Sequence, residues 1–316
     1  MLAARMGSDR SLAAVTGATG FLGRHLVAAL LAAGWHVRAL SRSGALPFGD
    51  ADIVAGDLED EQALGRLVEG ADVVIHAAGI VKAADAAAFA RVNVQGAARL
   101  VRLVTTRAPG AHFILISSLA AREPGLSPYA ASKRAAEDEA AVAIAPERLM
   151  IVRPPALYGA HDRETLALFK AARLPVTPLL ADGNERIALM HAGDAAAQIV
   201  ALAAARMPGR FCLADTQPAG YTLRTILSEA GHAQGRHPHF IRLPAAALKA
   251  AGQGASLAAR LSGRAIMLSP GKVREILHAD WSVDPDTMPR DLQVAPRDLV
   301  DGFAQTVAWY REAGWL

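Results

Sequence analysis

The chain has 316 residues, which is enough for one large α/β domain or for a domain with a smaller companion. Apolar residues make up 52% and aromatic residues 5%, a balance that favours helices covering a sheet and argues against disorder. The net charge of +3 is small and the arginines are spread along the chain, so we expect no nucleic-acid partner.

The chain shows no sign of export or of membrane insertion. Its first ten residues contain no long apolar run, and no segment reaches the ~18 uncharged apolar residues of a spanning helix. We therefore predict no integral membrane span and a cytoplasmic location. The single cysteine, Cys212, lies in the apolar segment 210–214 and is interpreted as a small core residue.

The first predicted element is an apolar strand over 12–15, followed by a glycine-rich turn and an apolar-periodic helix that includes 26–31. The turn has the spacing G-x-x-G-x-x-G at Gly17, Gly20 and Gly23. The first glycine permits the tight turn, the second lets a pyrophosphate approach the main chain, and the third lets the helix pack close to the strand. The N–H groups at the start of that helix would then hold the phosphates of a dinucleotide.

Short, nearly all-apolar segments then alternate with helical ones. We predict strands over 36–40, 52–55, 72–76, 113–116 and 149–152, and helices over 61–68, 84–106 and 128–143. Strands of this kind imply a parallel sheet that is buried on both faces. Right-handed crossovers make it an α/β fold of the doubly wound Rossmann type.

The regular alternation ends near residue 155. We assign 1–155 to an NAD(P)-binding domain and 156–316 mainly to a smaller C-terminal substrate domain. Residues 186–215, with a strand at Phe211, are expected to return to the main sheet. Helical patches are predicted over 194–205 and 245–261.

A possible acid/base pair lies on the predicted helix 128–143. Tyr129 and Lys133 are four residues apart and share one face of that helix. Free tyrosine has a pKa of ~10, and a nearby lysine cation lowers it, which makes the phenol usable for proton transfer. The lysine can also bind the ribose hydroxyls of a cofactor. Ser117 or Ser118, at the carboxyl end of the preceding strand, would bind the substrate oxygen.

The end of the second predicted strand bears on cofactor choice. An acidic residue there would bind the adenosine ribose and disfavour a 2′-phosphate. The segment 38–43 has no carboxylate, and Arg42 would pair with the extra phosphate through its planar fork. We therefore expect NADP in preference to NAD.

Several motifs follow one another in order over 11–215: V-T-G-A-T-G-F-L-G at 15–23, G-D-L at 56–58, H-A-A-G at 76–79, Asn93, Ser117-Ser118, Tyr129 with Lys133, and R-P at 153–154. As a set they resemble the extended short-chain dehydrogenase/reductase family, also called the NAD-dependent epimerase/dehydratase family. The resemblance implies a Rossmann fold, a C-terminal substrate domain and a catalytic group of Ser118, Tyr129 and Lys133.

The resemblance also implies roles in cofactor binding. Asp57 and Leu58 would lie beside the adenine, Asn93 would support the strand that carries 77–79, and the loop at Pro154 would run past the nicotinamide. The complete set of expected cofactor-binding residues is Gly17, Thr19, Gly20, Phe21, Leu22, Gly23, Arg42, Asp57, Leu58, Ala77, Ala78, Gly79, Tyr129, Lys133 and Pro154.

The segment between the serines and the tyrosine, 119–128, is short, whereas many sugar-nucleotide epimerases and dehydratases carry a longer one. The chain is therefore more similar to reductase-like and 3β-hydroxysteroid-dehydrogenase-like members and to relatives associated with respiratory complex I. We predict an NAD(P)-dependent oxidoreductase that interconverts a secondary alcohol and a ketone on a small substrate. The substrate is expected to be apolar if the segment 243–261 forms a lid over the site rather than helices that pack the small domain.

The sequence leaves the alternatives to this function and the oligomeric state open, and it predicts no metal binding. A sugar-nucleotide epimerase or dehydratase and a non-catalytic dinucleotide-binding subunit of a larger complex are the alternatives, and a homodimer is left open. No cluster among His161, Asp162, His191 and Asp194 has metal-ligand spacing, so we predict no metal. Asp194 is instead expected to cap the start of a helix.

Overall fold

The computed structural model describes residues 11–45, 49–180, 183–244, 246, 250, 253, 270–290, 292 and 294–316. Its centre is a seven-stranded sheet in the order β11-β6-β5-β4-β1-β2-β3, with every neighbouring pair parallel. The strands are β1 Leu12–Thr16, β2 His36–Ser41, β3 Asp52–Ala55, β4 Val73–His76, β5 His112–Ile116, β6 Leu149–Arg153 and β11 Gly209–Cys212. The predicted Rossmann-type α/β fold is confirmed.

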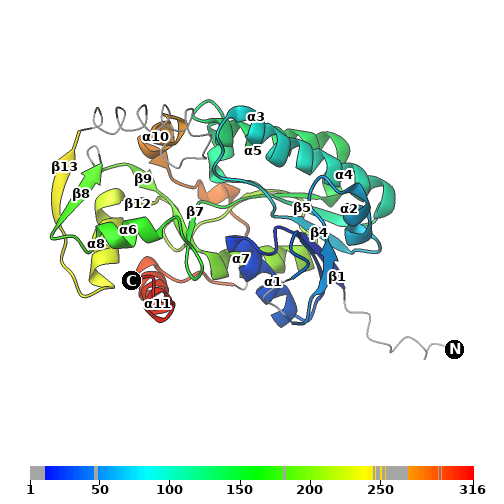
Figure 1. The fold of residues 1–316 in the computed structure, drawn as a ribbon, viewed down its shortest axis with the longest axis horizontal. Coiled ribbons are helices and arrows are strands. Elements are labelled where there is room, and N and C mark those ends of the chain that lie inside the picture. The colour runs from blue at the N-terminus through cyan, green and yellow to red at the C-terminus, as the bar shows by residue number, and fades with distance from the viewer. Residues whose placement is uncertain are drawn as a thin grey trace.

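Helices cover both faces of this sheet (Figure 1). On one face lie α1 Phe21–Ala32 and α7 Ala192–Ala204, and on the other lie α2 Glu61–Val68, α4 Gly96–Arg107 and α5 Pro128–Ala143. Successive residues of a strand point to opposite faces, so Ala13 and Val15 pack with α1 while Ala14 packs with α2 and α4. Both faces are therefore apolar, as the continuous apolar strands predict.

The helical stretch predicted over 84–106 is present but is not a single α-helix. It consists of α3 Ala86–Phe89, a π-helical segment Ala90–Gln95 and α4. π-Helical turns inside helices are frequently found at functional sites. Here the segment carries Asn93, whose side chain binds the loop after β4 and the neighbouring α5.

The rest of the chain forms small sheets and helices at one end of the molecule (Figure 1). The strands are β7 Ala156–Tyr158, β8 Val176–Leu180, β9 Arg186–Ile187, β10 Leu189–His191, β12 Tyr221–Thr222, β13 His239–Leu243 and β14 Asp280–Trp281. The helices are α6 Leu166–Ala171, α8 Leu223–His232, α10 Pro270–Ile276 and α11 Leu299–Glu312. Their shared core contains Tyr158, Phe169, Phe303 and Tyr310.

Three details bear on the sequence predictions. The strand at Phe211 joins the main sheet beside β6, and Cys212 at its end is buried. The helix predicted over 194–205 begins at Ala192, and its N-cap is His191 rather than Asp194. Asp194 does not cap because its carboxylate, inside the first turn, binds the guanidinium of Arg297 at 2.7 Å.

The predicted helix 245–261 and the lid 243–261 lie outside the described residues, apart from Leu243 at the end of β13, Pro244 and the isolated residues 246, 250 and 253. Within the described part of the chain, no helix combines the length and the apolar character needed to cross a membrane.

Candidate active site

The glycine turn joins β1 to α1 and leaves no room for side chains. Gly17 has φ +75°, and a Cβ there would lie 2.6 Å from the backbone nitrogen of Ala78. A Cβ on Gly23 would lie 1.9 Å from the carbonyl oxygen of Gly17. Gly20 is the N-cap of α1 and supplies no side-chain cap, so the first N–H groups of the helix are left for another acceptor. Thr19 and Gly20 are exposed, whereas Phe21 and Leu22 are half-buried.

A buried pair of side chains ties β1 to β4 just behind this turn. The Oγ1 atom of Thr16 lies 2.7 Å from Nδ1 of His76, and the Ala78 N–H donates to the same hydroxyl at 3.3 Å. Burial lowers the pKa of His76 to about 3, so the imidazole is neutral. Between β1 and β4 the strand order reverses, which is where open α/β sheets bind their ligands.

The loop after β4 reaches α5 through Asn93. The amide oxygen of Asn93 accepts from the Ile80 N–H at 2.8 Å, and its nitrogen donates to Ser132 at 2.9 Å. A Cβ on Gly79 would lie 4.0 Å from Nζ of Lys133. The structure thus brings the loop 77–79, Asn93 and the predicted lysine to one place.

Ser118 and Tyr129 are joined by a hydrogen bond between their side chains. Burial raises the pKa of Tyr129 and outweighs the opposite effect of this bond, so the lowering expected from Lys133 is not the net result in this structure. Lys133 is buried and donates to the carbonyl of Ile116 at 2.6 Å, and burial lowers its pKa to about 8. The aromatic ring of Phe89 lies 6.1 Å from that of Tyr129.

Ser117 is engaged elsewhere. Its hydroxyl donates to the fully buried carboxylate of Glu137 at 2.5 Å, and the same carboxylate accepts two bonds from Arg153 at 2.8 and 2.6 Å. Of the two adjacent serines, Ser118 is therefore the one that faces the tyrosine. Glu137 was not singled out in the sequence, although it follows Lys133 by four residues, the same interval that separates Tyr129 from Lys133.

The segment 119–128 is held by the end of the chain. Ser127, the N-cap of α5, donates to the buried carboxylate of Glu275, and Arg274 donates to the Leu126 carbonyl at 2.7 Å. Arg122 donates to the Ser282 carbonyl at 2.7 Å. The charge of Glu275 also contributes to the raised pKa of Tyr129. No short sequence motif predicts these contacts, because they join residues far apart in sequence.

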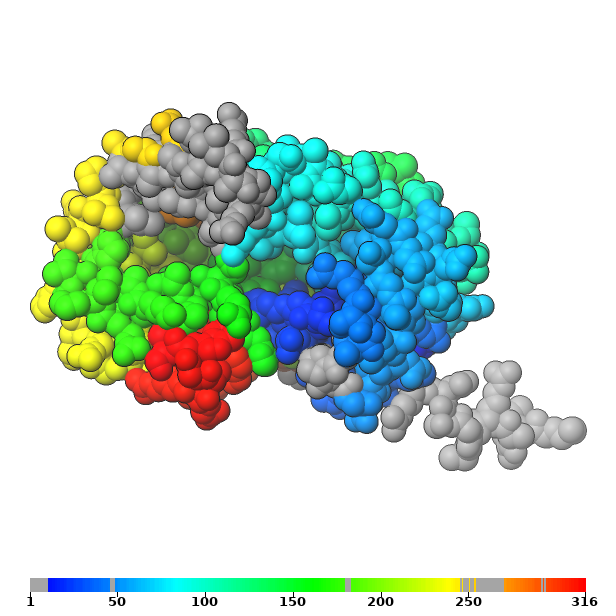
Figure 2. All heavy atoms as spheres, viewed as in Figure 1, coloured from blue at the N-terminus to red at the C-terminus, as the bar shows by residue number. Residues whose placement is uncertain are grey.

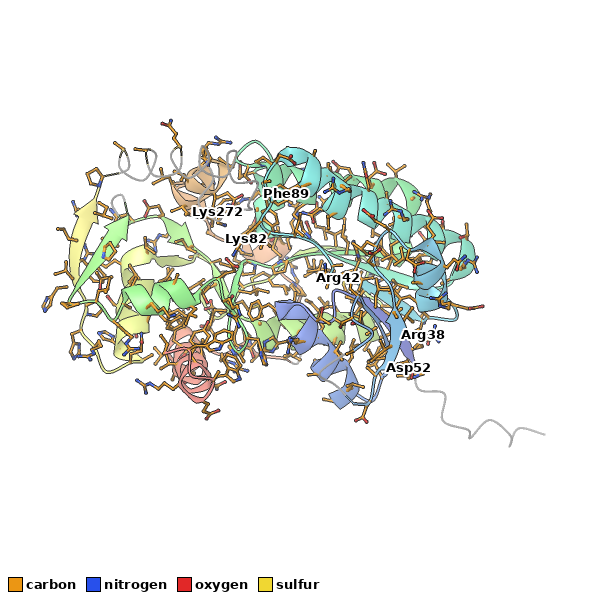
Figure 3. All side chains as sticks on the ribbon, in the orientation of Figure 1. Arg38, Arg42, Asp52, Lys82, Phe89 and Lys272 are labelled. Atoms are coloured by element: carbon orange, nitrogen blue, oxygen red, sulfur yellow. The ribbon has the colours of Figure 1, made fainter. Side chains whose placement is uncertain are left out.

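The other expected cofactor residues lie at the same carboxyl edge of the sheet. Arg42 follows β2 and is exposed, and it forms no ion pair with any residue that the structure describes. Arg38, in contrast, donates to carbonyls at the end of α2, and the two arginines are labelled in Figure 3. Asp57 is exposed and accepts from the Glu59 N–H at 2.8 Å.

Two backbone carbonyls complete this edge. Leu58 accepts from Arg99 at 2.6 Å, and the buried Pro154 accepts from the Leu119 N–H at 2.8 Å, so the loop after β6 leaves the sheet beside Ser118. Among the described residues, no group of three or more His, Cys, Asp or Glu side chains has the geometry to hold a metal ion.

The residues at this edge fit a dinucleotide. Figure 2 shows the molecule hollowed between the first half of the chain (blue to cyan) and the second half (green to yellow), with the α1 region inside the hollow. The glycine turn has reserved space that a Cβ would fill, and the first turn of α1 contains no acidic residue that would repel phosphate. Lys82 and Glu164 form a 2.5 Å ion pair between the two halves, and Lys82 is labelled in Figure 3.

Comparisons with known proteins agree with this geometry. Residues 13–212 match the family model described as the NAD-dependent epimerase/dehydratase family. The chain is 47% identical over 313 residues to the ceramide reductase of Caulobacter vibrioides, covering 97% of this chain and 96% of the relative. It is 31% identical over 266 residues to a 4-hydroxy-2-methyl-3-oxo-4-farnesyl-3,4-dihydroquinoline-1-oxide ketoreductase of Stigmatella aurantiaca, covering 75% and 77%.

Solved structures show the same fold at low sequence identity. The UDP-N-acetylglucosamine 4-epimerase of Bacillus cereus superposes with a TM-score of 0.70 at 16% identity, covering 96% of each chain. MoeE5, solved with UDP-glucose and NAD, superposes with a TM-score of 0.73 at 20% identity, covering 96% of this chain and 99% of MoeE5. The chain therefore belongs to the NAD-dependent epimerase/dehydratase family, as an enzyme whose Rossmann fold serves a nicotinamide dinucleotide.

Proposed function

We propose that this enzyme is a reductase that converts a ketone to a secondary alcohol, with Ser118, Tyr129 and Lys133 as its catalytic residues. The observation that carries the proposal is the hydrogen bond between Ser118 and Tyr129, formed at the carboxyl edge of the sheet with Lys133 one helical turn away. The raised pKa of Tyr129 keeps the phenol protonated at neutral pH, and a protonated phenol is the form that can give a proton to a ketone oxygen.

Each residue then has one task. The nicotinamide, when bound, supplies the hydride to the carbonyl carbon. Ser118 binds the substrate oxygen and holds the Tyr129 hydroxyl toward it. Tyr129 transfers its proton to that oxygen, and the buried ammonium of Lys133 favours the phenolate that remains. Since Lys133 is buried, its charge is weakly screened by solvent.

We further propose that the ketone belongs to an apolar, ceramide-class lipid. Leu119, directly after Ser118, belongs to a buried apolar cluster with Val283 and Trp281 of the second half, so the chain next to Ser118 packs against apolar side chains. The two relatives described above act, by their names, on a ceramide and on a farnesyl-bearing ring ketone. A sugar nucleotide would need polar groups beside Ser118 to pair with its hydroxyls.

The substrate class is tested by thermal shift. The purified enzyme is melted with a nicotinamide dinucleotide and then with either a long-chain keto-amide or UDP-glucose added. Binding to the native state raises the melting temperature, so a rise with the keto-amide alone supports the proposal. A rise with UDP-glucose alone, together with NAD that stays bound through purification, would favour an epimerase or dehydratase.

The mechanism is tested by Tyr129→Phe, which removes one hydroxyl. We expect turnover with a ketone to fall about 10²- to 10⁴-fold, because a positioned general acid contributes that much. Binding of the dinucleotide, measured by fluorescence titration, should change little. Turnover within a few-fold of wild type would show that the tyrosine is not the proton donor.

We propose NADP as the preferred cofactor, because Arg42 is exposed after β2 where no carboxylate would repel a 2′-phosphate. Arg42→Ala should lower the ratio of kcat/KM for NADPH to that for NADH by about tenfold or more, the loss of one charge-assisted phosphate contact. Arg66→Ala, at an exposed arginine on α2, is the matched control and should leave the ratio unchanged. An unchanged ratio in the Arg42 variant would assign the preference to other residues.

A further inference from the structure

The outer surface of the small sheet β8–β13 carries an unusual group of exposed apolar side chains. Val176 is 52% exposed, Ile241 55% and Leu243 38%, and Leu174 just before β8 is 49% exposed. We call these four residues the β8–β13 face. In Figure 1 these two strands lie at the end of the molecule farthest from the main sheet.

Strand geometry explains why these residues are outside. β8 and β13 pair in parallel, with Val176 opposite His239 and Pro178 opposite Ile241. The residues between them, Leu179 and Phe240, point the other way and pack into the apolar core. The inward residues therefore contribute to the core of the folded protein, whereas the outward ones do not.

The two segments that form this face carry charged residues of only one sign. The segments 170–180 and 235–244 contain no acidic residue, although the whole chain has 30. They contain four basic residues, all exposed: Lys170, Arg173, Arg236 and Arg242. Since the net charge of the whole chain is only +3, positive charge is concentrated here.

A recess beside the face is lined by arginine. It has a volume of about 180 Å³ and is formed by Arg173, Gln234, Arg236, Arg311 and Leu316. Two of these arginines also flank the β8–β13 face. Three arginines around one recess suit a phosphate, because a guanidinium group binds phosphate through paired hydrogen bonds.

We propose that the β8–β13 face docks on a membrane surface that contains anionic phospholipid. The four apolar side chains would enter the boundary between headgroups and acyl chains, and the arginine recess would hold a headgroup phosphate. Docking against a second copy of this chain is disfavoured, because a two-fold contact would bring arginines against arginines. The inference goes beyond the proposed reaction, as none of its residues belongs to the Ser118–Tyr129 site.

The test is flotation of the full-length enzyme with lipid vesicles. Vesicles of phosphatidylcholine alone are compared with vesicles of phosphatidylcholine and phosphatidylglycerol in equal parts, at low and high salt. We expect binding to the anionic vesicles only, and weaker binding at high salt, because mobile ions screen exposed charges. Wild-type protein that floats equally with both vesicle types, or with neither, would overturn the proposal.

Two variants separate the contributions. The charge variant is Arg173→Gln with Arg236→Gln, the two arginines that both flank the face and line the recess. The apolar variant is Val176→Ser with Ile241→Ser. Each should reduce the vesicle-bound fraction about tenfold or more. The charge variant loses electrostatic attraction to the anionic lipid, and the apolar variant loses apolar area that enters the membrane boundary. The control is Val142→Ser with Arg134→Gln on α5, where the valine is 89% exposed, and it should float like the wild type.

Folding and activity are measured in parallel. All variants should melt like the wild type and reduce a small water-miscible ketone at the wild-type rate, so that failure of the proposed reaction is distinguishable from failure of docking. If the charge variant melts early, Arg236→Gln alone is used and should still lower binding several-fold. If the charge and apolar variants float like the wild type, the proposal is overturned. It is also overturned if they change only the oligomeric mass of the protein in solution, a result that would indicate self-association.

Discussion

Two adjacent serines at the end of β5 have different partners, and this separates chemistry from stability at the scale of single residues. Ser118→Ala removes the hydroxyl that binds Tyr129, so kcat should fall about 10²-fold or more, as when one polar contact to a reacting oxygen is lost. Ser117→Ala removes a bond to buried Glu137 and should instead lower the free energy of unfolding by about 1–3 kcal/mol.

Steady-state kinetics and urea unfolding of both variants decide the assignment. If Ser117→Ala lost more turnover than Ser118→Ala while both stayed folded, the roles of the two serines would have to be exchanged. The sequence alone places both at the end of the strand and cannot choose between them. The choice depends on Glu137 and Arg153, whose side chains meet Ser117 only in the folded protein.

At the scale of elements, one face of α5 carries three polar side chains at or beside the candidate active site. Tyr129, Lys133 and Glu137 follow one another at intervals of four residues, and Glu137 is fully buried against Arg153. Glu137→Gln leaves the guanidinium of Arg153 without a charged partner, so we expect a loss of about 3–5 kcal/mol in the free energy of unfolding.

The neighbouring carboxylate on the same helix is a matched control. Asp138 pairs with Arg134 at the surface, where the two side chains are 62% and 43% exposed. Asp138→Asn should cost less than about 1 kcal/mol in a urea titration, because exposed ion pairs contribute little. Equal losses in the two variants would mean that the buried carboxylate does not anchor α5 to β6.

Periodicity was sufficient to predict the main sheet but not the smaller elements. The apolar strands and amphipathic helices are recognisable from their local sequence patterns, so the predicted bounds of β1 to β6 are all close to those in the structure. The π-helical segment Ala90–Gln95 could not be predicted, because it depends on Asn93 reaching Ile80 and Ser132. The two-residue strands β9, β12 and β14 exist only through pairing with each other.

At the scale of the whole molecule, the second half of the chain supports the candidate active site. Glu275 binds the N-cap of the helix that carries Tyr129, and Arg122 and Leu126 in the short segment before it are held by the same region. The sequence shows that the segment 119–128 is short, but it does not show the contacts with the C-terminal region that hold this segment in place. The position of Tyr129, the proposed catalytic tyrosine, thus depends on packing between residues that are far apart in sequence.

Buried histidines give the whole molecule a predicted sensitivity to acid. Burial lowers the pKa of His76 to about 3 and that of His191 to about 4. Both are neutral in the folded protein at a pH where the unfolded chain, with a pKa of 6.5, binds a proton. Their stabilising contribution is complete above pH 6.5 and is lost as the pH falls toward their folded values. Asp215, whose pKa burial raises to about 6, has the opposite effect and offsets part of this loss.

Urea unfolding at pH 7 and at pH 5 measures this loss. The free energy of unfolding should fall by about 2 kcal/mol for each of the two histidines, less the part offset by Asp215. His76→Asn retains an oxygen near the position of Nδ1 for Thr16 but cannot titrate, so its loss between the two pH values should be smaller by about 2 kcal/mol. His232→Asn, at an exposed position, should show the full wild-type loss. A wild-type protein equally stable at both pH values would mean that His76 becomes protonated without unfolding, which would break its link between β1 and β4 behind the glycine turn.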